Sequence, residues 1–458
     1  MSGDVTDAVP TILQPLSSDE YRAPPRTEVQ QRATYATADE SVAAARRVAT
    51  PLQSYVASQR GTASGLLALN QATGREYFKM PPEAGLDDAA AQAAFASDGP
   101  VIDVQTHWIA DRPSLKTFET NIMNVYKMLA PDWWDGIEGI ASYNIAQYLR
   151  CVFIEADTAL AVISAAPGND DGEMFLKNDE LAGMRELFDR AMGTRRLLNH
   201  TVVRPNIGEA NRMAEWAAAY SPVGWKVYTM GLMDDDYQHY RPGTGWRLDD
   251  DESGMPLLEA ARATGIKVVC AHKGLSGMVD AGSPDDVGPA ALAYPDIDFL
   301  IYHSGYEPGQ SEGPYLQETS DQGINRLIKS VQDSGLGHGS NVYAELGSTW
   351  FMVLSRPEDA AHTLGKLLLH LGEDNIVWGT DAIWYGPTQP VLDAFRAFQI
   401  PDEMCERYGY PKLTPSVKRK ILAGNAARVY GIDLAELSIA ARTDDLSWTN
   451  EVLAAYGA

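Results

Sequence analysis

Short apolar segments that end in polar residues recur along the chain from about residue 100 onward. Eight of them have the length and the branched side chains of buried strands, and they are Val101–His107, Cys151–Glu155, Thr201–Asn206, Trp225–Thr229, Val268–His272, Phe299–His303, Val342–Glu345 and Ile376–Asp381. Runs with apolar residues at helical spacing lie between them, such as Leu181–Met192, Met255–Thr264, Ile324–Ser334 and Pro357–Leu371. This alternation of strand and helix predicts a parallel sheet.

Eight strand–helix units over about 330 residues predict the α/β fold known as the (β/α)8 barrel, of the TIM type. Long insertions are expected in the loops that follow the strands. An open, doubly wound sheet is the structural alternative. The turn after the first predicted strand lacks the glycine-rich sequence of a dinucleotide-binding site, and this disfavours the open sheet.

The barrel pattern covers residues 96–432 and leaves a segment on each side of it. Residues 1–95 are expected to form a helical N-terminal extension, in which residues 1–28 are a surface arm rich in proline, serine and acidic side chains. Residues 433–458 are rich in alanine and acidic residues, and they predict a helical C-terminal tail.

Composition narrows the classes of partner that the protein can have. The 458 residues are 45% hydrophobic and 22% charged, as in ordinary globular proteins, and the net charge of −25 disfavours nucleic acid as a partner. The three cysteines are widely spaced, which is typical of a reducing compartment. With no apolar run long enough for a membrane span and no signal-peptide pattern at the start, we expect a cytoplasmic protein.

Rare polar residues collect at the ends of the predicted strands. Three of the eight histidines, His107, His272 and His303, end the first, fifth and sixth strands, and the last two strands end at Glu345 and Asp381. Because the C-terminal ends of barrel strands meet on one face, these side chains are expected to converge there. A lone strand histidine is more often a hydrogen-bonded core residue. Imidazoles and carboxylates at separate strand ends instead favour a site for Zn, Fe or Mn.

The first strand carries an unusual pair of polar residues. Gln105 and His107 lie two residues apart, so their side chains point to the same face of the strand. In many barrel metalloenzymes both positions are histidine. An amide oxygen is a neutral and weaker ligand than imidazole, and a metal bound beside Gln105 would keep a more open, oxygen-rich shell.

Six segments together resemble the amidohydrolase superfamily, in its amidohydrolase-related branch, over about residues 99–432. They are Asp103–His107 (DVQTH), Val268–Gly274 (VVCAHKG), Phe299–Gly305 (FLIYHSG), Asn341–Gly347 (NVYAELG), Gly372–Asp381 (GEDNIVWGTD) and Lys420–Tyr430 (KILAGNAARVY). The resemblance implies that a metal-bound water is the nucleophile and that Asp381 is a general base. It implies metal ligands from strands one, five, six and eight, which are His107, His272, His303 and Asp381.

Two positions depart from the hydrolases of this superfamily. Gln105 replaces a histidine, and Glu345 adds a carboxylate on strand seven that could bridge two irons. The alternative for Glu345 is a salt bridge to Lys226 or Arg204, because a buried carboxylate needs a partner. Lys226 itself has three possible roles, as a carboxylated lysine that bridges two metals, a substrate-binding cation or the partner of Glu345.

The long N-terminal section and the DVQTH strand also resemble the diiron monooxygenases of platensimycin and platencin biosynthesis. This resemblance implies two Fe ions, O₂ as co-substrate and an external electron donor. The implied reaction is hydroxylation of an unactivated C–H bond in a polycyclic diterpenoid acid or its thioester. Two alternatives remain, a Zn or Mn hydrolase or decarboxylase in which Asp381 moves protons, and an inactive barrel that binds a ligand or partner.

Aromatic and basic residues near the strand ends are candidates for contact with an apolar acid. Trp108, Trp384 and Tyr385 lie in loops that could line a large apolar cavity, or that could instead pack as a lid on the barrel. Lys273 and Arg204 could pair with a substrate carboxylate. The N-terminal arm could also reach a second subunit in a homo-oligomer.

Overall fold

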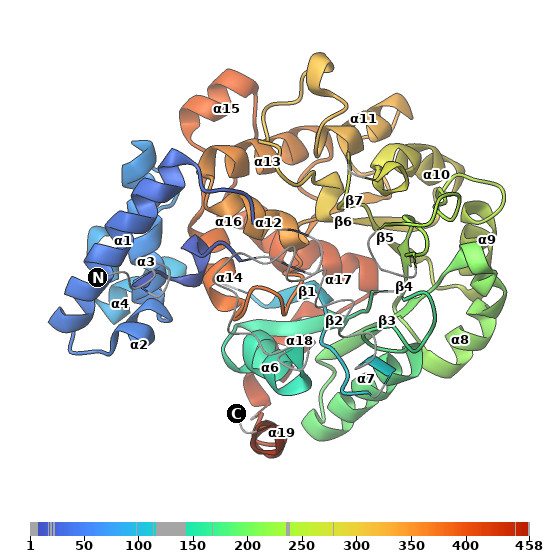
Figure 1. The fold of residues 1–458 in the computed structure, drawn as a ribbon, viewed down its shortest axis with the longest axis horizontal. Helices are drawn as coiled ribbons and strands as arrows, with labels where there is room; N and C mark the ends of the chain where they lie inside the picture. Colours follow the sequence, from blue (N-terminus) through green and yellow to red (C-terminus); the bar gives the residue numbers. More distant parts are fainter. Residues whose placement is uncertain are drawn as a thin grey trace.

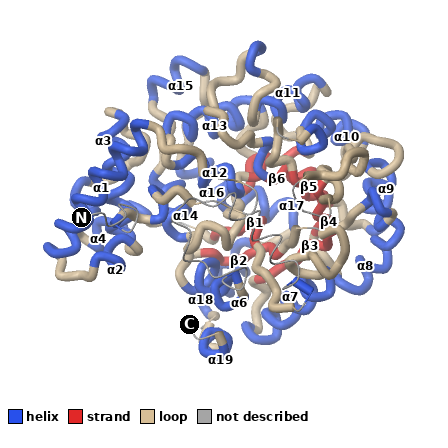
Figure 2. The backbone as a smooth tube through the Cα atoms, viewed as in Figure 1, coloured by secondary structure: helices blue, strands red, loops and turns tan. Residues whose placement is uncertain are grey.

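Eight parallel strands form a barrel at the centre of the molecule, surrounded by helices (Figures 1 and 2). The computed structural model describes residues 8–16, 18, 21, 23–97, 99–112, 114–115, 143–166, 168–234, 239–277, 279–444 and 446–456. The strands are β1 (Val101–Thr106), β2 (Thr158–Ile163), β3 (Leu197–Val202), β4 (Gly224–Tyr228), β5 (Val268–His272), β6 (Asp298–Tyr302), β7 (Val342–Glu345) and β8 (Ile376–Val377). They follow one another around the sheet in chain order.

Hydrogen bonds between β1 and the segment directly after β8 close the barrel. The Val104 N–H donates to the Trp378 carbonyl at 3.1 Å, and the Asp381 N–H donates to the Gln105 carbonyl at 3.0 Å. With the other neighbouring strands all paired in parallel, the predicted α/β barrel is confirmed.

Helices cover the outside of the barrel in the order expected of a (β/α)8 fold (Figure 2). They are α6 (Ile145–Leu149), α7 (Asn178–Met192), α8 (Met213–Tyr220), α9 (Gly254–Thr264), α10 (Val287–Ala293), α11 (Asn325–Asp333), α12 (Gly347–Leu354), α13 (Pro357–His370), α14 (Gln389–Ala397), α15 (Asp402–Tyr408), α16 (Pro415–Arg419) and α17 (Asn425–Tyr430). The four helices predicted between strands agree with α7, α9, α11 and α13 within a few residues.

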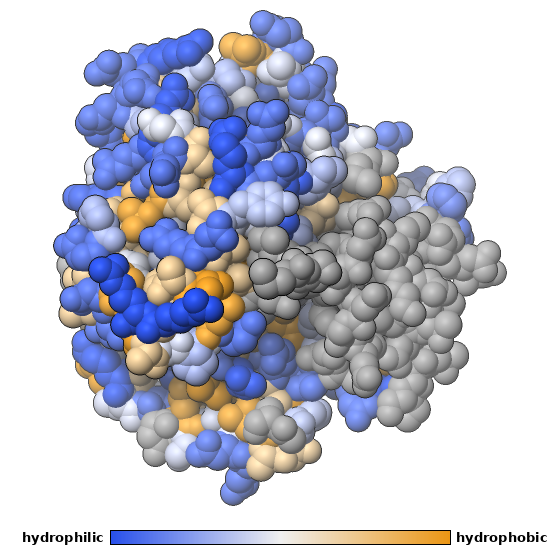
Figure 3. All heavy atoms as spheres, turned by 60° about the vertical axis from the view of Figure 1, so that its left-hand side comes forward, coloured by the Kyte–Doolittle hydropathy of each residue, from blue (hydrophilic) through white to orange (hydrophobic). Residues whose placement is uncertain are grey.

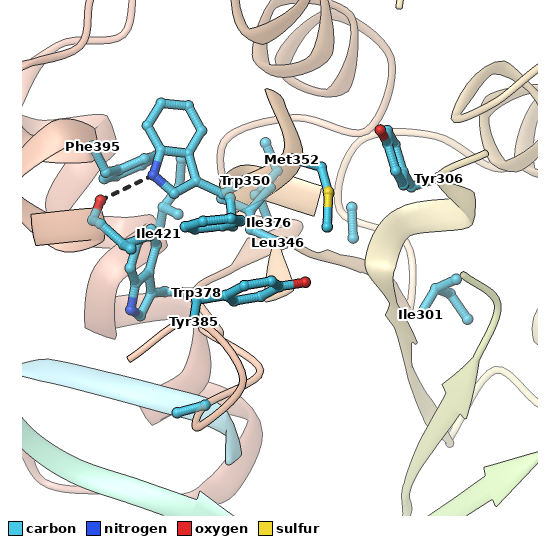
Figure 4. Close-up of a cluster of buried hydrophobic side chains, with 14 of the residues drawn as sticks. Ile301, Tyr306, Leu346, Trp350, Met352, Ile376, Trp378, Tyr385, Phe395 and Ile421 are labelled. Carbon is cyan, nitrogen blue, oxygen red and sulfur yellow. Dashed lines mark hydrogen bonds between the residues drawn. The ribbon is translucent and has the colours of Figure 1, made fainter. Parts of the chain in front are cut away.

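Apolar side chains fill the barrel below the candidate site and also the layer between strands and helices. Inside, Val104, Leu160 and Leu300 belong to one buried cluster that Ala426 of α17 joins from the bottom. Outside, Trp350 of α12 packs edge-on against Phe395 of α14, with ring centroids 5.3 Å apart. The Trp350 indole N–H also donates to the Val391 carbonyl at 3.0 Å (Figure 4). A filled interior leaves the C-terminal ends of the strands as the place for chemistry.

The second predicted strand, Cys151–Glu155, is wrong. Asn144 caps helix α6, and that helix continues into a π-helical turn over Arg150–Ile154, where the Glu155 N–H donates to the Arg150 carbonyl at 2.8 Å. The branched residues of this segment suit a strand, but the cap and the helical hydrogen bonds override that preference. The second strand is the alanine-containing segment β2, which the sequence pattern did not single out.

Two other predicted strands have displaced boundaries. The pattern predicts the third at Thr201–Asn206, whereas β3 ends at Val202 and a 3₁₀ turn follows over Pro205–Ile207. Proline cannot donate to a strand ladder, which explains the early end. The pattern predicts the eighth at Ile376–Asp381, whereas β8 contains only Ile376 and Val377, and the polar end of the segment has no regular secondary structure.

The N-terminal extension lies on one side of the barrel, next to α14 (Figure 1). Its helices are α1 (Glu28–Arg47), α2 (Leu52–Val56), α3 (Gln59–Thr73) and α4 (Asp88–Phe95). Thr27 caps α1 in a capping box with Gln30, so this helix begins where the predicted arm ends. Ile12 and Leu13 of the arm are buried, which anchors it to the rest of the molecule.

The C-terminal tail forms two helices, α18 (Leu434–Thr443) and α19 (Thr449–Ala455), which contact β2 and α6 respectively. On the face that carries the N-terminal helices, the described surface is mostly hydrophilic, and hydrophobic residues occur there in small separate groups (Figure 3). None of the helices in the described ranges is long and apolar enough to cross a membrane.

A buried carboxylate at the junction of the extension and the barrel predicts a pH-dependent stability. Asp393 of α14 accepts hydrogen bonds from Gln59 at 3.0 Å and Gln389 at 2.8 Å, and burial raises its pKa to about 6. The folded state therefore binds the proton more tightly than the unfolded state, and the associated stability is lost as the pH rises from 3.8 through 6. Relative to an Asp393→Asn variant, the wild-type free energy of unfolding should fall by about 2–3 kcal/mol between pH 4 and pH 7. Urea titrations of both proteins across that range test this, and parallel pH profiles would contradict it.

Candidate metal centre and active site

The ends of β1 and β8 bring two predicted ligands onto one carboxylate. Gln105 Nε2 donates to Asp381 Oδ1 at 2.7 Å, and His107 Nε2 lies 2.6 Å from the same oxygen. All three side chains are buried. The intervening residue, Thr106, points away and contacts the Tyr148 hydroxyl at 3.0 Å. The alternation expected from the sequence thus places Gln105 and His107 on the same side of the strand.

Asp103 holds the segment that carries Asp381, although the sequence did not identify Asp103 as a site residue. Its Oδ1 accepts from the backbone N–H groups of Gln105 at 3.2 Å and Thr380 at 3.0 Å, and its Oδ2 accepts from the Thr380 hydroxyl. Burial raises the pKa of Asp103 to about 7, against these hydrogen bonds. The Asp103 side chain therefore connects β1 to the segment directly after β8.

Asp381 is held as a carboxylate in a strained backbone. Burial alone would raise its pKa, but the hydrogen bond with His107 and the charges of His303 and His107 outweigh burial and lower the pKa below its ordinary value. Ser348 donates a further hydrogen bond to Oδ2. The φ angles of Asp381 and His303 are +57° and +64°, a region that side chains other than glycine rarely adopt and that is concentrated at functional sites.

The histidines at the ends of β5 and β6 adjoin this carboxylate. The rings of His272 and His303 meet edge-on with centroids 4.8 Å apart, and His303 Nε2 lies 3.4 Å from Gln105 Nε2. His272 also stacks on Tyr228 at 4.5 Å. Burial and the nearby Lys226 charge lower the pKa of His272 well below its ordinary value, which leaves it neutral. A neutral imidazole is the form that binds metal.

Glu345 lies beside the site and accepts two backbone hydrogen bonds. Its oxygens receive the N–H groups of His303 at 2.9 Å and Gly347 at 2.6 Å, while burial raises its pKa to about 8. A β-carbon on Gly347 would lie 2.6 Å from Gln105 Oε1 and 2.7 Å from Glu345 Oε2, and one on Gly379 would overlap Glu345. Glycine at both positions is what lets the Glu345 carboxylate approach Gln105.

Lys226 extends into the barrel interior between aromatic rings. Its Nζ lies 3.4 Å from the ring centroid of Tyr302 and 4.8 Å from that of Tyr228, and the residue is 0% exposed. The face of an aromatic ring attracts a cation, which favours the ammonium form over a carboxylated lysine here.

The two cations predicted to bind a substrate carboxylate are both paired inside the protein. Lys273 Nζ lies 2.8 Å from Asp286 Oδ2, and both side chains are buried. Arg204 Nε lies 3.1 Å from Glu209 Oε1, and Arg204 also pairs with Asp171. The carboxylates that pair with Arg204 are thus Glu209 and Asp171 and not Glu345. These ion pairs give neither Lys273 nor Arg204 a contact with substrate.

Two of the three predicted aromatic wall residues contact the site directly. Trp384 lies 6.0 Å from the His107 ring and packs against Tyr143 at 5.0 Å, centroid to centroid. The Tyr385 hydroxyl lies 2.6 Å from Ser348 Oγ, the hydroxyl that also contacts Asp381. Trp108 is buried in the segment that follows β1.

Ser348 is a site residue that sequence analysis missed. It bonds both Asp381 and Tyr385 from the first turn of α12, directly after β7. The one available signal was its position three residues after Glu345, at the end of a predicted strand. Serine is common at such ends, so the position alone does not indicate chemistry.

The donor types at the site fit a divalent cation. Within the described ranges, no group of three or more His, Cys, Asp or Glu side chains is already spaced as a metal shell, and His107 and Asp381 touch each other directly. Gln105 Oε1 is nevertheless buried without a hydrogen-bond partner among the described residues. An unsatisfied amide oxygen beside an ionised carboxylate and the neutral His272 imidazole is the chemistry that a bound metal would satisfy.

Solved structures with a similar chain path are distant in sequence. An uncharacterised TIM-barrel protein from Bordetella bronchiseptica is 15% identical, with 74% of this chain and 99% of that chain covered and a TM-score of 0.45. A dihydroxybenzoic acid decarboxylase from a Polaromonas species, solved with manganese and 2-nitroresorcinol, is 12% identical, covers 73% and 97%, and has a TM-score of 0.40. A dihydropyrimidinase from Brevibacillus agri is 13% identical, covers 73% and 71%, and has a TM-score of 0.38.

The family assignment comes from the sequence of the barrel itself. No curated protein matches the chain. The family model described as amidohydrolase matches residues 102–432, which is most of the chain and includes every predicted metal ligand. The strand order, the converging His107, His272, His303 and Asp381, and this match agree, and the chain belongs to the amidohydrolase family (Amidohydro_2) of the amidohydrolase superfamily.

Proposed function

We propose that this protein is a divalent-metal-dependent hydrolase or lyase, with decarboxylation of a small carboxylic acid as the lyase reaction. One observation carries the proposal, the meeting of Gln105 and His107 on the Asp381 carboxylate at the C-terminal end of the barrel. The lowered pKa keeps Asp381 ionised at neutral pH, and the ionised form is the one that can bind a metal or accept a proton.

The metal would be held by His107, His272 and Asp381, with His303 and the Gln105 amide oxygen available as further donors. A Zn²⁺ or Mn²⁺ ion, when bound, would polarise a substrate oxygen and make a water molecule more acidic. The buried surroundings of these residues would exclude bulk water and strengthen every charge interaction at the site.

A chain of hydroxyl groups gives Asp381 a route for protons. Asp381 Oδ2 accepts from Ser348 Oγ, and Ser348 Oγ lies 2.6 Å from the Tyr385 hydroxyl. Tyr385 is held in place by stacking on Phe351, with ring centroids 3.9 Å apart and planes 10° apart. Asp381 would accept a proton from substrate or water and exchange it with Tyr385 through Ser348.

Tyr385→Phe should lower kcat about 10–100-fold, because it removes the last hydroxyl of this chain. KM and stability should change little, since the ring and its stacking on Phe351 remain. If the two hydroxyls act as one relay, Ser348→Ala should cost a similar factor and the double variant no more than either alone. Steady-state kinetics of the three variants test this, and multiplicative losses would contradict a shared relay.

The proposed reaction class is tested with metal-reconstituted protein. Metal-free protein would be loaded with Zn²⁺ or Mn²⁺ and assayed under argon against aromatic carboxylic acids, cyclic amides and lactones, with CO₂ release and ring opening as readouts. Turnover that requires the metal and not O₂ supports the proposal. Tight metal binding without turnover under argon, followed by O₂ uptake in air, would contradict it.

A second candidate function is a diiron monooxygenase, and Glu345 is the observation that favours it. A β-carbon on Gly347 would lie within 3 Å of both the Glu345 carboxylate and Gln105 Oε1, so these two groups are close to each other. Glu345 also contacts the backbone of His303. An additional carboxylate next to three imidazoles and Asp381 supplies enough donors for two Fe ions. Hydroxylation of an apolar acid, such as a polycyclic diterpenoid acid or its thioester, would consume O₂, two electrons and two protons per C–H bond. An external electron donor would therefore be required.

Iron content and Glu345→Gln separate the two candidates. About two irons per chain with substrate-dependent O₂ uptake, both lost in Glu345→Gln, would favour the monooxygenase. Because Gln keeps the shape of Glu345 but not its charge, a mononuclear site should keep one metal and its turnover in this variant. Protein that binds no metal tightly and turns over nothing would instead indicate an inactive barrel that binds a ligand.

A further inference from the structure

Tyr21 belongs to the N-terminal extension, yet it lies against the candidate ligand His303. The side chain of Tyr21 is completely buried, and its ring meets the His303 ring edge-on, with centroids 5.5 Å apart and planes at 89°. A second edge contact, at 5.7 Å, joins it to Tyr306. A residue from outside the matched family range therefore touches an imidazole of the site.

The Tyr21 hydroxyl is anchored at the end of β5. It donates to the Gly274 carbonyl at 2.6 Å, two residues after His272. A β-carbon on Gly274 would overlap the Tyr21 hydroxyl and lie 2.6 Å from His303 Cδ2. Only glycine leaves space for both rings, so Tyr21 connects the segments that carry the two histidines.

Contacts on both sides along the chain hold Tyr21 in this position. The Tyr21 N–H donates to Ser18 Oγ at 2.9 Å, and the Ser18 N–H donates to the Tyr21 carbonyl at 2.9 Å. Upstream, Ile12 is buried in the turn that packs on α3 and α14. Downstream, Gln30 Nε2 donates to Ser355 Oγ at the end of α12.

We propose that Tyr21 is a positioning residue of the active site, which fixes the ring of His303 toward Gln105 and Asp381. The metal site of this barrel would then be complete only with the N-terminal extension packed against it. The inference rests on the metal-dependent function proposed above. Its physical basis is packing, because the His303 ring meets the Tyr21 ring edge-on at 5.5 Å and the His272 ring edge-on at 4.8 Å. Removing the Tyr21 ring would take away one of the contacts that hold the His303 ring in place.

Three substitutions in the full-length protein test this role, with Co²⁺ as the probe. Tyr21→Ala removes ring and hydroxyl, Tyr21→Phe removes only the hydroxyl, and Tyr35→Ala removes a tyrosine of the same extension that is 60% exposed. Tyr21→Ala should weaken Co²⁺ binding roughly tenfold or more and change the visible absorption of the bound ion, as loss of a residue that orients a ligand does. Tyr21→Phe should show a smaller change in the same direction, and Tyr35→Ala none.

Wild-type affinity and absorption in folded Tyr21→Ala would overturn the proposal, since Tyr21 would then only pack the arm. If circular dichroism shows that Tyr21→Ala does not fold, Tyr21→Leu, which keeps bulk without an aromatic ring, replaces it with the same expected result.

A second readout in metal-free protein separates this inference from the proposed function. Failure of the wild type to bind Co²⁺ would refute the metal-dependent function alone. Ring-nitrogen NMR of ¹⁵N-histidine-labelled protein would then test the positioning role of Tyr21. The His303 signals would be identified by their loss in His303→Gln. Tyr21→Ala should shift the His303 ring-nitrogen signals and leave those of histidines outside the site unchanged, whereas unchanged His303 signals would overturn the positioning role.

Discussion

Asp381→Asn is expected to lower kcat about 10³-fold, a larger effect on activity than removal of the Ser348 or Tyr385 hydroxyl. Asparagine keeps the size of the side chain and one acceptor oxygen for Gln105. It removes the negative charge that faces His107 and the proton acceptor bonded to Ser348. Both losses act on the reaction, because the carboxylate is placed to bind metal and to accept a proton.

Kinetics at saturating metal separate these two contributions. The affinity for Zn²⁺ or Mn²⁺ should fall in Asp381→Asn, and the loss in kcat should persist when enough metal is added to refill the site. Asp393→Asn is the matched control, since Asp393 is also a buried aspartate but lies between α14 and the N-terminal extension. A kcat within tenfold of wild type at saturating metal would exclude Asp381 as the proton acceptor.

The candidate site could be predicted where it depends on local strand geometry. Residues two apart on a strand share a face, so Gln105 and His107 were expected together, and both reach Asp381 Oδ1. The barrel then brings the ends of separate strands to one face, which accounts for the contact between His272 and His303. Neither inference requires knowledge of how distant segments pack.

Strand assignment failed where local preference and context disagree. Cys151–Glu155 has the composition of a strand, but it continues a helix that the Asn144 cap begins in the preceding residues. The true strand β2 contains alanines, which have no strong preference for strands and fit here because the segment is buried against α18 and its neighbours β1 and β3. Burial depends on how distant segments pack, so the pattern of apolar and polar residues within six positions does not reveal it.

Contacts made across the fold were also beyond prediction. Tyr21 lies in an irregular arm, so no periodicity indicates which partner it packs against, and its place beside His303 follows from how the arm crosses the barrel. Lys273 follows the candidate ligand His272 directly, and this proximity in sequence suggested a contact with substrate. Lys273 lies just beyond the end of β5, however, and the structure places its side chain against Asp286.

Lys273→Met is therefore expected to lower the free energy of unfolding by about 3–5 kcal/mol rather than to weaken substrate binding. Lys273 and Asp286 are 0% and 1% exposed, and Lys273 also donates to the Ala281 carbonyl at 3.2 Å. Removing the ammonium would leave the Asp286 carboxylate buried beside it without its counter-charge. Urea unfolding of the variant, followed by circular dichroism, measures the loss.

The double variant Lys273→Met/Asp286→Asn is the control that identifies the cause. In the wild type the Leu248 N–H donates a hydrogen bond to Asp286 Oδ2 at 2.8 Å. Asparagine can still accept this hydrogen bond, and it carries no charge that needs a partner. The double variant should therefore lose less stability than the sum of the two single variants, with a coupling energy of about 1–3 kcal/mol. If Lys273→Met instead keeps the wild-type free energy of unfolding and raises KM for a carboxylate substrate, then Lys273 reaches the substrate, and the buried pair with Asp286 is not the state in which the protein works.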